Sequence, residues 1–150
     1  MDAVTYPNEK LADFINNTVV PLKIQVDSKL AGRFEVKWTP SLLILDGEGK
    51  EHYRTTGFMA AEELIPSILL GIGNAHFNRD EFADALAAYE QVLTKHGASD
   101  AAPEAMFQRG VAGYKSTHDP KPLKAAYEQL TKKYPKSEWA KRAQPYRLIP

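Results

Sequence analysis

The apolar residues in the first part of the chain begin with a helical spacing. Leu11, Phe14 and Ile15 follow one another at intervals of three and four residues, which predicts an amphipathic helix over residues 8–17. Asn8 is suited to cap the start of this helix. The pattern after residue 17 no longer fits a helix, and we expect strands there.

Two segments of the first half have the composition of β-strands. Residues 19–27 are rich in β-branched side chains that partly alternate with polar ones, which predicts a strand. Residues 41–46 are almost continuously apolar, as in a strand that is covered on both faces. Residues 47–50 have turn chemistry, so residues 51–55 are predicted to return as the second strand of a hairpin. A short helix is expected over residues 28–36.

The second half repeats a pattern of small and large residues typical of a helix–turn–helix repeat of about 34 residues. With Gly73 as the glycine of the pattern, its packing positions hold Leu69, Ile72, Gly73, Ala75, Phe82, Ala85, Tyr89, Val92 and Leu93. A second copy, offset by 37 or 38 residues, holds Met106, Gly110, Leu123, Tyr127, Leu130 and Pro135. Residues 137–146 are expected to begin a third unit that caps the stack. These residues resemble the tetratricopeptide repeat.

The resemblance to tetratricopeptide repeats implies a concave groove, lined by the first helix of each pair, that binds an extended peptide or a partner helix. By the repeat pattern, the groove residues would be Leu70, Asn74, Phe77, Asn78, Val111, Tyr114 and Lys115. The alternative is that this groove packs against the N-terminal part of the chain and only supports it.

The first half resembles the second half of thioredoxin-like proteins. The expected order is helix, strand, helix, a Trp38-Thr39-Pro40 loop, hairpin and helix. The residues Met1, Asp2, Thr5, Tyr6 and Asp27 match a thioredoxin-like subgroup in which a Met follows the second Cys of Cys-x-x-Cys by three residues. We therefore expect a mixed α/β and all-α chain. An incomplete thioredoxin-like βαββα domain over residues 1–66 would precede a helical array of the tetratricopeptide type over residues 67–150.

The thioredoxin-like resemblance implies a role for the Trp38-Thr39-Pro40 loop. In that family the bond before the proline is cis, and the loop leaves backbone groups free to pair with an extended peptide. The plain alternative is that Thr39-Pro40 only opens a strand. The family also has a strand between segments 19–26 and 41–46, and this chain has no residues to form it. We therefore expect these two segments to pair directly or to self-associate into a homo-oligomer.

The absence of cysteine excludes disulfides, thiolate metal sites and thiol catalysis in this chain. We therefore expect a redox-inactive module that binds a protein or peptide and is not an enzyme. The alternative is a fragment of a thiol–disulfide oxidoreductase whose Cys-x-x-Cys lies upstream of Met1. The compartment stays open, since a true start at Met1 favours the cytoplasm and a longer parent protein allows the periplasm.

Charge and the remaining motifs limit the classes of partner that we expect for this chain. Residues 121–150 hold 8 Lys or Arg against 2 Asp or Glu, which fits a solvated helical face or an acidic partner. The basic residues form no dense run, so no nucleic-acid partner is expected. No apolar run reaches the ~18–20 residues that span a bilayer, so no membrane partner is expected. None of the four histidines lies in an H-E-x-x-H arrangement, and we expect no metal site, no cofactor and no catalytic residue.

Overall fold

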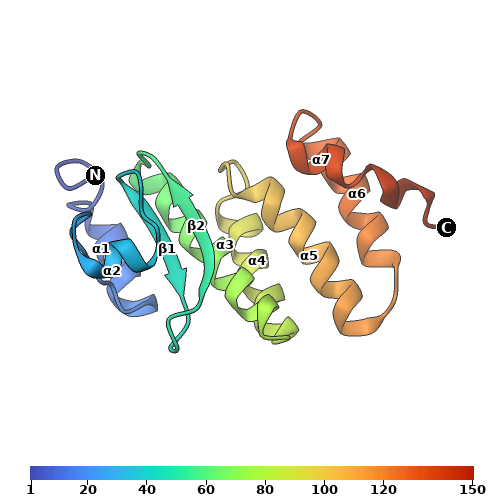
Figure 1. Ribbon diagram of the computed structural model, residues 1–150. Helices are drawn as coiled ribbons and strands as arrows, with labels where there is room; N and C mark the ends of the chain where they lie inside the picture. Colours follow the sequence, from blue (N-terminus) through green and yellow to red (C-terminus); the bar gives the residue numbers. More distant parts are fainter.

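The computed structural model describes residues 1–150, with the elements arranged in one elongated body (Figure 1). The N-terminal part contains helices α1 (Glu9–Thr18) and α2 (Lys29–Arg33) and strands β1 (Ser41–Leu45) and β2 (Glu51–Thr56). The helical part contains α3 (Ala61–Asn78), α4 (Phe82–Lys95), α5 (Ala102–Thr117), α6 (Lys121–Lys133), α7 (Glu138–Arg142) and the 3-10 helix η1 (Gln144–Leu148). No helix is both long and apolar enough to cross a membrane.

The N-terminus is tied to the start of α3. The side chain of Asn8 accepts a hydrogen bond from the backbone N–H of Leu11 at 3.0 Å, which caps α1 as predicted. Leu11 is fully buried and packs against Leu64 and Ile68 of α3. Thr5 is also buried, and its hydroxyl donates to the carbonyl of Met59 at 2.7 Å.

The strand predicted over residues 19–27 is wrong. The segment forms no strand, and the only sheet has the two strands β1 and β2. Val20 is 96% exposed and Leu22 is 74% exposed, so the segment also lacks an apolar surface to lie on. Strand propensity reflects packing against neighbouring strands, and this segment has none beside it.

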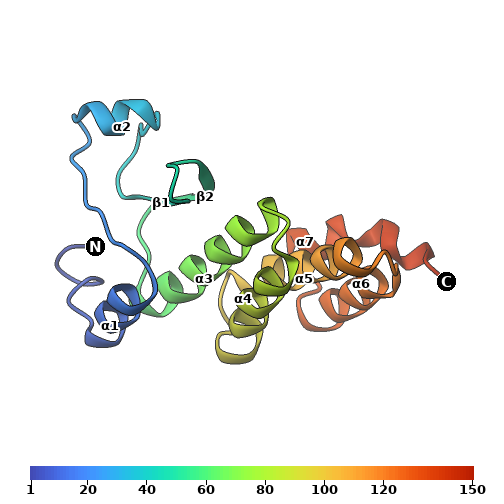
Figure 2. The ribbon, with the colours of Figure 1, turned by 90° about the horizontal axis from the view of Figure 1, so that it is seen from below.

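The hairpin pairs β1 with β2 in antiparallel register, with Ser41 opposite Thr56, and has an irregularity between Ile44 and Leu45. One face of the hairpin packs on α3, as Figure 2 shows from below. No helix covers the other face, so β1 is half-buried. The expectation that β1 is covered on both faces is therefore wrong.

The helical part consists of two antiparallel pairs, α3 with α4 and α5 with α6. Gly73 of α3 lies directly on the ring of the buried Tyr89 of α4, where any Cβ would overlap the ring. The third unit is shorter than the predicted helix because α7 ends at Arg142, and the chain continues as η1 with Pro145 near its start. The predicted boundary between residues 66 and 67 falls inside the continuous helix α3.

Candidate functional site

The β-hairpin covers part of the expected groove face of α3. Leu70 is 1% exposed and lies in the same apolar cluster as Tyr53 of β2, so it does not line an open groove as predicted. A Cβ at Gly71 would lie 2.5 Å from Cγ1 of Ile44 and 2.9 Å from the ring of Tyr53. The hairpin therefore approaches α3 as closely as the absence of a side chain at Gly71 allows.

Two polar contacts fix the hairpin along α3. The hydroxyl of Tyr53 lies 3.2 Å from the hydroxyl of the buried Ser67. Burial raises the pKa of Tyr53, which keeps its hydroxyl protonated. At the other end of α3, the amide group of Asn78 donates to Nδ1 of His52 at 3.1 Å. The two contacts lie eleven residues apart on α3, but both start from neighbouring residues of β2, His52 and Tyr53.

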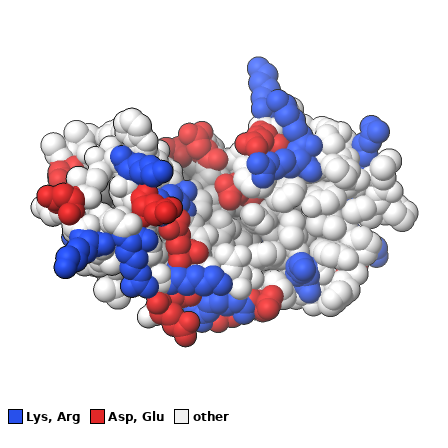
Figure 3. All heavy atoms as spheres, in the orientation of Figure 1, with Lys and Arg blue, Asp and Glu red and all other residues white.

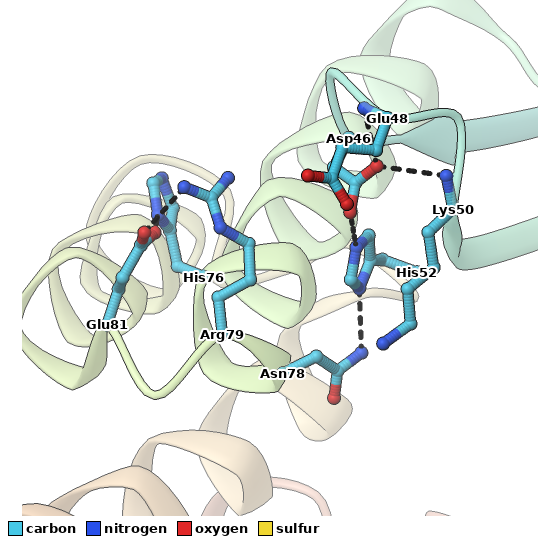
Figure 4. A network of polar contacts seen from close by, with 8 residues as sticks. All are labelled: Asp46, Glu48, Lys50, His52, His76, Asn78, Arg79 and Glu81. Atoms are coloured by element: carbon cyan, nitrogen blue, oxygen red, sulfur yellow. Dashed lines mark hydrogen bonds and ion pairs between the residues drawn. The ribbon is translucent and has the colours of Figure 1, made fainter.

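His52 is the centre of a polar network at the tip of the hairpin (Figure 4). Its side chain is 0% exposed, and Nε2 lies 2.8 Å from Oδ2 of Asp46. Since Nδ1 accepts from Asn78, the proton of the neutral ring lies on Nε2 and is donated to Asp46. The other carboxylate oxygen of Asp46 accepts the backbone N–H groups of Glu48 and Lys50.

The pKa of Asp46 is lowered to about 2 by these contacts. The hydrogen bond from His52 is the largest cause, and the backbone N–H of Lys50 is the next. No motif in the sequence predicts this network. The only signal for it was an Asp at the end of an apolar strand before a Gly-containing turn.

The remaining predicted residues of α3 are also engaged within the chain. Asn74 accepts a hydrogen bond at 2.8 Å from the hydroxyl of Tyr89. Phe77 is half-buried and meets the ring of Phe82 edge to face, with 5.7 Å between ring centroids. Asn74 and Phe77 therefore contact α4, whereas Asn78 contacts His52 of the hairpin.

The corresponding face of α5 is open. Lys115 is exposed, Tyr114 is 36% exposed and Val111 is half-buried. Phe107 borders this face, with Trp139 and Tyr146 at centroid distances of 5.1 and 5.7 Å. In Figure 3 the surface over α5 is mostly uncharged, with charged side chains gathered above it toward α7.

The Trp38-Thr39-Pro40 loop lies apart from the α5 face, on the other side of the hairpin (Figure 1). Trp38 is 74% exposed, and the Thr39–Pro40 peptide bond is cis. The carbonyl of Pro40 accepts the N–H of Gly57 at 2.9 Å, so this oxygen pairs within the hairpin. A peptide-binding role for the loop stays a prediction.

A surface depression of about 510 Å³ lies between the α4–α5 loop and the α6–α7 loop. Charges of both signs line it: Asp100, Lys133, Lys136 and Glu138. None of the predicted groove or loop residues borders it. Its lining includes no histidine, so it offers no arrangement of a nucleophile beside an imidazole base.

A family model of the tetratricopeptide repeat matches residues 68–99. The comparison with curated proteins gives no match, and the comparison with solved structures gives none either. The matched range covers most of α3 and all of α4, and the α5–α6 pair repeats their antiparallel packing. Residues 68–99 therefore resemble a tetratricopeptide repeat, a motif that mediates protein–protein interactions.

Proposed function

We propose that the chain is a protein-binding module that holds a peptide segment or helix of a partner protein on the face of α5. One observation supports this more than any other: the hairpin and α4 occupy most of the α3 face, whereas Val111, Tyr114 and Lys115 stay accessible on α5. Tyr114 offers a large apolar ring with a hydroxyl at its end, and such side chains often contribute most to binding. Lys115 adds a cation that favours a partner with a nearby carboxylate.

A peptide selected from a random library against the full chain tests this proposal by fluorescence anisotropy. We expect Tyr114→Ala to weaken binding about tenfold, because removal of an energetically important interface tyrosine costs more than about 1 kcal/mol. Trp38→Ala is the matched control, since Trp38 is an exposed aromatic residue in the loop between α2 and β1. Loss of binding in Trp38→Ala but not in Tyr114→Ala would instead support the cis-proline loop as the peptide site.

The finer identity of the N-terminal part is also a proposal: a redox-inactive, thioredoxin-like scaffold. Its support is the order of α1, α2, hairpin and α3, with the Trp38-Thr39-Pro40 loop before β1. The purified chain should not reduce insulin disulfides, because it has no sulfur nucleophile. The alternative, a piece of a thiol–disulfide oxidoreductase, predicts that the endogenous protein is several kDa heavier than 16.7 kDa and gains mass on thiol alkylation.

A second candidate property of the chain is self-association, which its exposed and unpaired backbone segments favour. Segment 19–26 exposes Val20 and Leu22 and pairs with no strand, and β1 pairs through one edge only. Unpaired strand edges promote pairing with another chain. Light scattering over a range of protein concentrations tests this. We expect Leu22→Lys to lower the average mass and the control Val4→Lys, at another exposed apolar position, to leave it unchanged.

A further inference from the structure

The turn between α3 and α4 brings together three side chains that can bind a metal ion. His76 lies near the end of α3, Glu81 directly before α4, and Asp84 in the first turn of α4. One ligand atom from each residue lies within 4.8 Å of the other two. We propose that His76, Glu81 and Asp84 bind a divalent transition-metal ion such as Zn²⁺.

The backbone of the turn holds this arrangement in place. The N–H groups of Arg79 and Glu81 both donate to the carbonyl of His76, at 3.1 and 3.0 Å. Asp80 between them has a φ of 59°, and its N–H donates to the carbonyl of Phe77 at 3.1 Å. The relative positions of the end of α3 and the start of α4 are therefore fixed. Because folding already brings the three side chains together, metal binding costs little further conformational entropy.

The donor set selects the class of ion. One imidazole nitrogen and two carboxylate oxygens suit Zn²⁺ and similar first-row ions, whereas Ca²⁺ and Mg²⁺ prefer oxygen ligands alone. Three protein ligands leave coordination positions for water or for a group of a bound partner. His76 and Glu81 are each about one-third exposed, so an ion can enter from solvent.

The contact between His76 and Glu81 shows what metal binding would change (Figure 4). Nδ1 of His76 lies 2.6 Å from Oε2 of Glu81, and the ring N–H donates to this carboxylate oxygen. Metal bonds of about 2.0–2.2 Å require the two atoms to separate to roughly 3.4 Å in a tetrahedral site. The proton of the neutral ring moves from Nδ1 to Nε2, and the Nδ1 lone pair then binds the ion.

Arg79 has two opposing effects on the proposed site. Its guanidinium pairs with Oε1 of Glu81, the oxygen that does not face His76, and so orients Oε2 toward the ion. Outer partners of this kind commonly orient metal ligands. Its positive charge also repels a cation. The competing explanation is therefore an ion-pair network of His76, Arg79 and Glu81 that stabilises the turn without a metal.

Calorimetric titration of the chelator-treated full chain with Zn²⁺ distinguishes the two explanations. We expect one saturable site in the wild type and at least about tenfold weaker binding in His76→Ala and in Asp84→Asn. His118→Asn is the matched control, because it removes a histidine from another turn and asparagine tolerates the φ of 59° there. Equal loss in His118→Asn, or no binding by the wild type, would overturn the proposal.

A measurement on the unmutated chain avoids variants that fail to fold. Addition of Zn²⁺ should shift the NMR signals of the His76 ring and of the Glu81 and Asp84 amides, and leave those of His118 in place. It should also raise the melting temperature of the wild type, because an ion that binds only the folded state stabilises it. Shifts spread over all four histidines would mean nonspecific surface binding and would contradict the site.

Discussion

At the scale of single residues, two glycines set how closely neighbouring elements approach α3. Gly73 makes room for the ring of Tyr89 inside the first repeat, as the repeat pattern predicted. Gly71 makes room for Ile44 and Tyr53 of the hairpin, and no repeat pattern requires a glycine there. The glycine at position 71 is therefore explained by the close packing of the hairpin on α3, and not by a bound partner.

Gly71→Ala should loosen the hairpin from α3. The added Cβ would meet Ile44 at 2.5 Å and Tyr53 at 2.9 Å, so one of the side chains or the hairpin must move. Overpacking of this kind costs about 1–3 kcal/mol in the free energy of unfolding, which urea denaturation measures. Gly32→Ala is the control, since a Cβ there meets nothing within 4 Å. Equal stability of the two variants would mean that the hairpin is not packed as described.

Glu104 gives a pH-dependent prediction at the same scale. Burial is the main cause that raises its pKa above the ordinary 4.5, while a hydrogen bond from Asn74 acts in the opposite direction. As pH rises, Glu104 therefore loses its proton in the unfolded chain at a lower pH than in the folded chain. This difference lowers the free energy of unfolding as pH rises past 4.5. Glu104→Gln should melt at a higher temperature than the wild type at neutral pH, with the gain disappearing below that pKa. A gain of the same size at acidic pH would contradict a role for ionisation.

At the scale of elements, the sequence predicted best where a local pattern determines the structure. The helix over 8–17 and the hairpin strands were placed to within a residue or two, because caps, turns and apolar spacing are local signals. The strand over 19–27 was wrong because a strand needs a neighbour that the local pattern cannot supply. Its β-branched residues are equally compatible with the extended, unpaired chain that the structure contains.

The candidate site was harder to predict for the same reason. The repeat pattern identified the face of each first helix, and Val111, Tyr114 and Lys115 are accessible there. It could not show that the hairpin covers the other helix, because contacts such as Asn78 with His52 join residues 26 positions apart. The cluster of His76, Glu81 and Asp84 was missed because its spacing crosses a turn and matches no helical metal motif.

The network at the hairpin tip predicts an acid-sensitive contact between the hairpin and α3. The folded pKa of Asp46, about 2, lies below its ordinary value of 3.8. The carboxylate therefore contributes stability above pH 3.8, and this contribution is lost as pH falls from there through about 2. Asp46→Asn should be less stable than the wild type near neutral pH, and the difference should shrink over that acid range.

Urea denaturation at several pH values measures the effect of Asp46→Asn. Asp13→Asn, at an exposed position on α1, is the control and should follow the wild type. Hydrogen exchange shows which part of the chain is affected. As pH falls, the amides of β1 and β2 should lose protection before those of α5. If the free energies of unfolding of Asp46→Asn and the wild type differed by the same amount at all pH values, the charge of Asp46 would not be the cause of its stabilising effect.

At the scale of the whole molecule, each unit contacts mainly its neighbours along the chain. The hairpin packs on α3, α4 packs on α5, and α7 and η1 pack on the α5–α6 pair (Figures 1 and 2). In such linear arrays stability is close to a sum of units and of the interfaces between neighbours. Damage at one end should therefore weaken that end most.

Gly110→Ala tests this at the C-terminal end. The added Cβ would lie 2.6 Å from Cβ of Ala126 and 3.0 Å from the carbonyl of Pro122, which forces α5 and α6 apart at a cost of about 1–3 kcal/mol. In a Trp38→Phe background, Trp139 is the single tryptophan and reports its packing on Phe107. Gly110→Ala should lower the urea midpoint of the Trp139 fluorescence more than Gly71→Ala does. Hydrogen exchange of the hairpin amides should instead be accelerated more by Gly71→Ala than by Gly110→Ala. Equal shifts of both probes in both variants would mean that the chain unfolds as one cooperative unit, and that the stability of the hairpin depends on the α5–α6 pair.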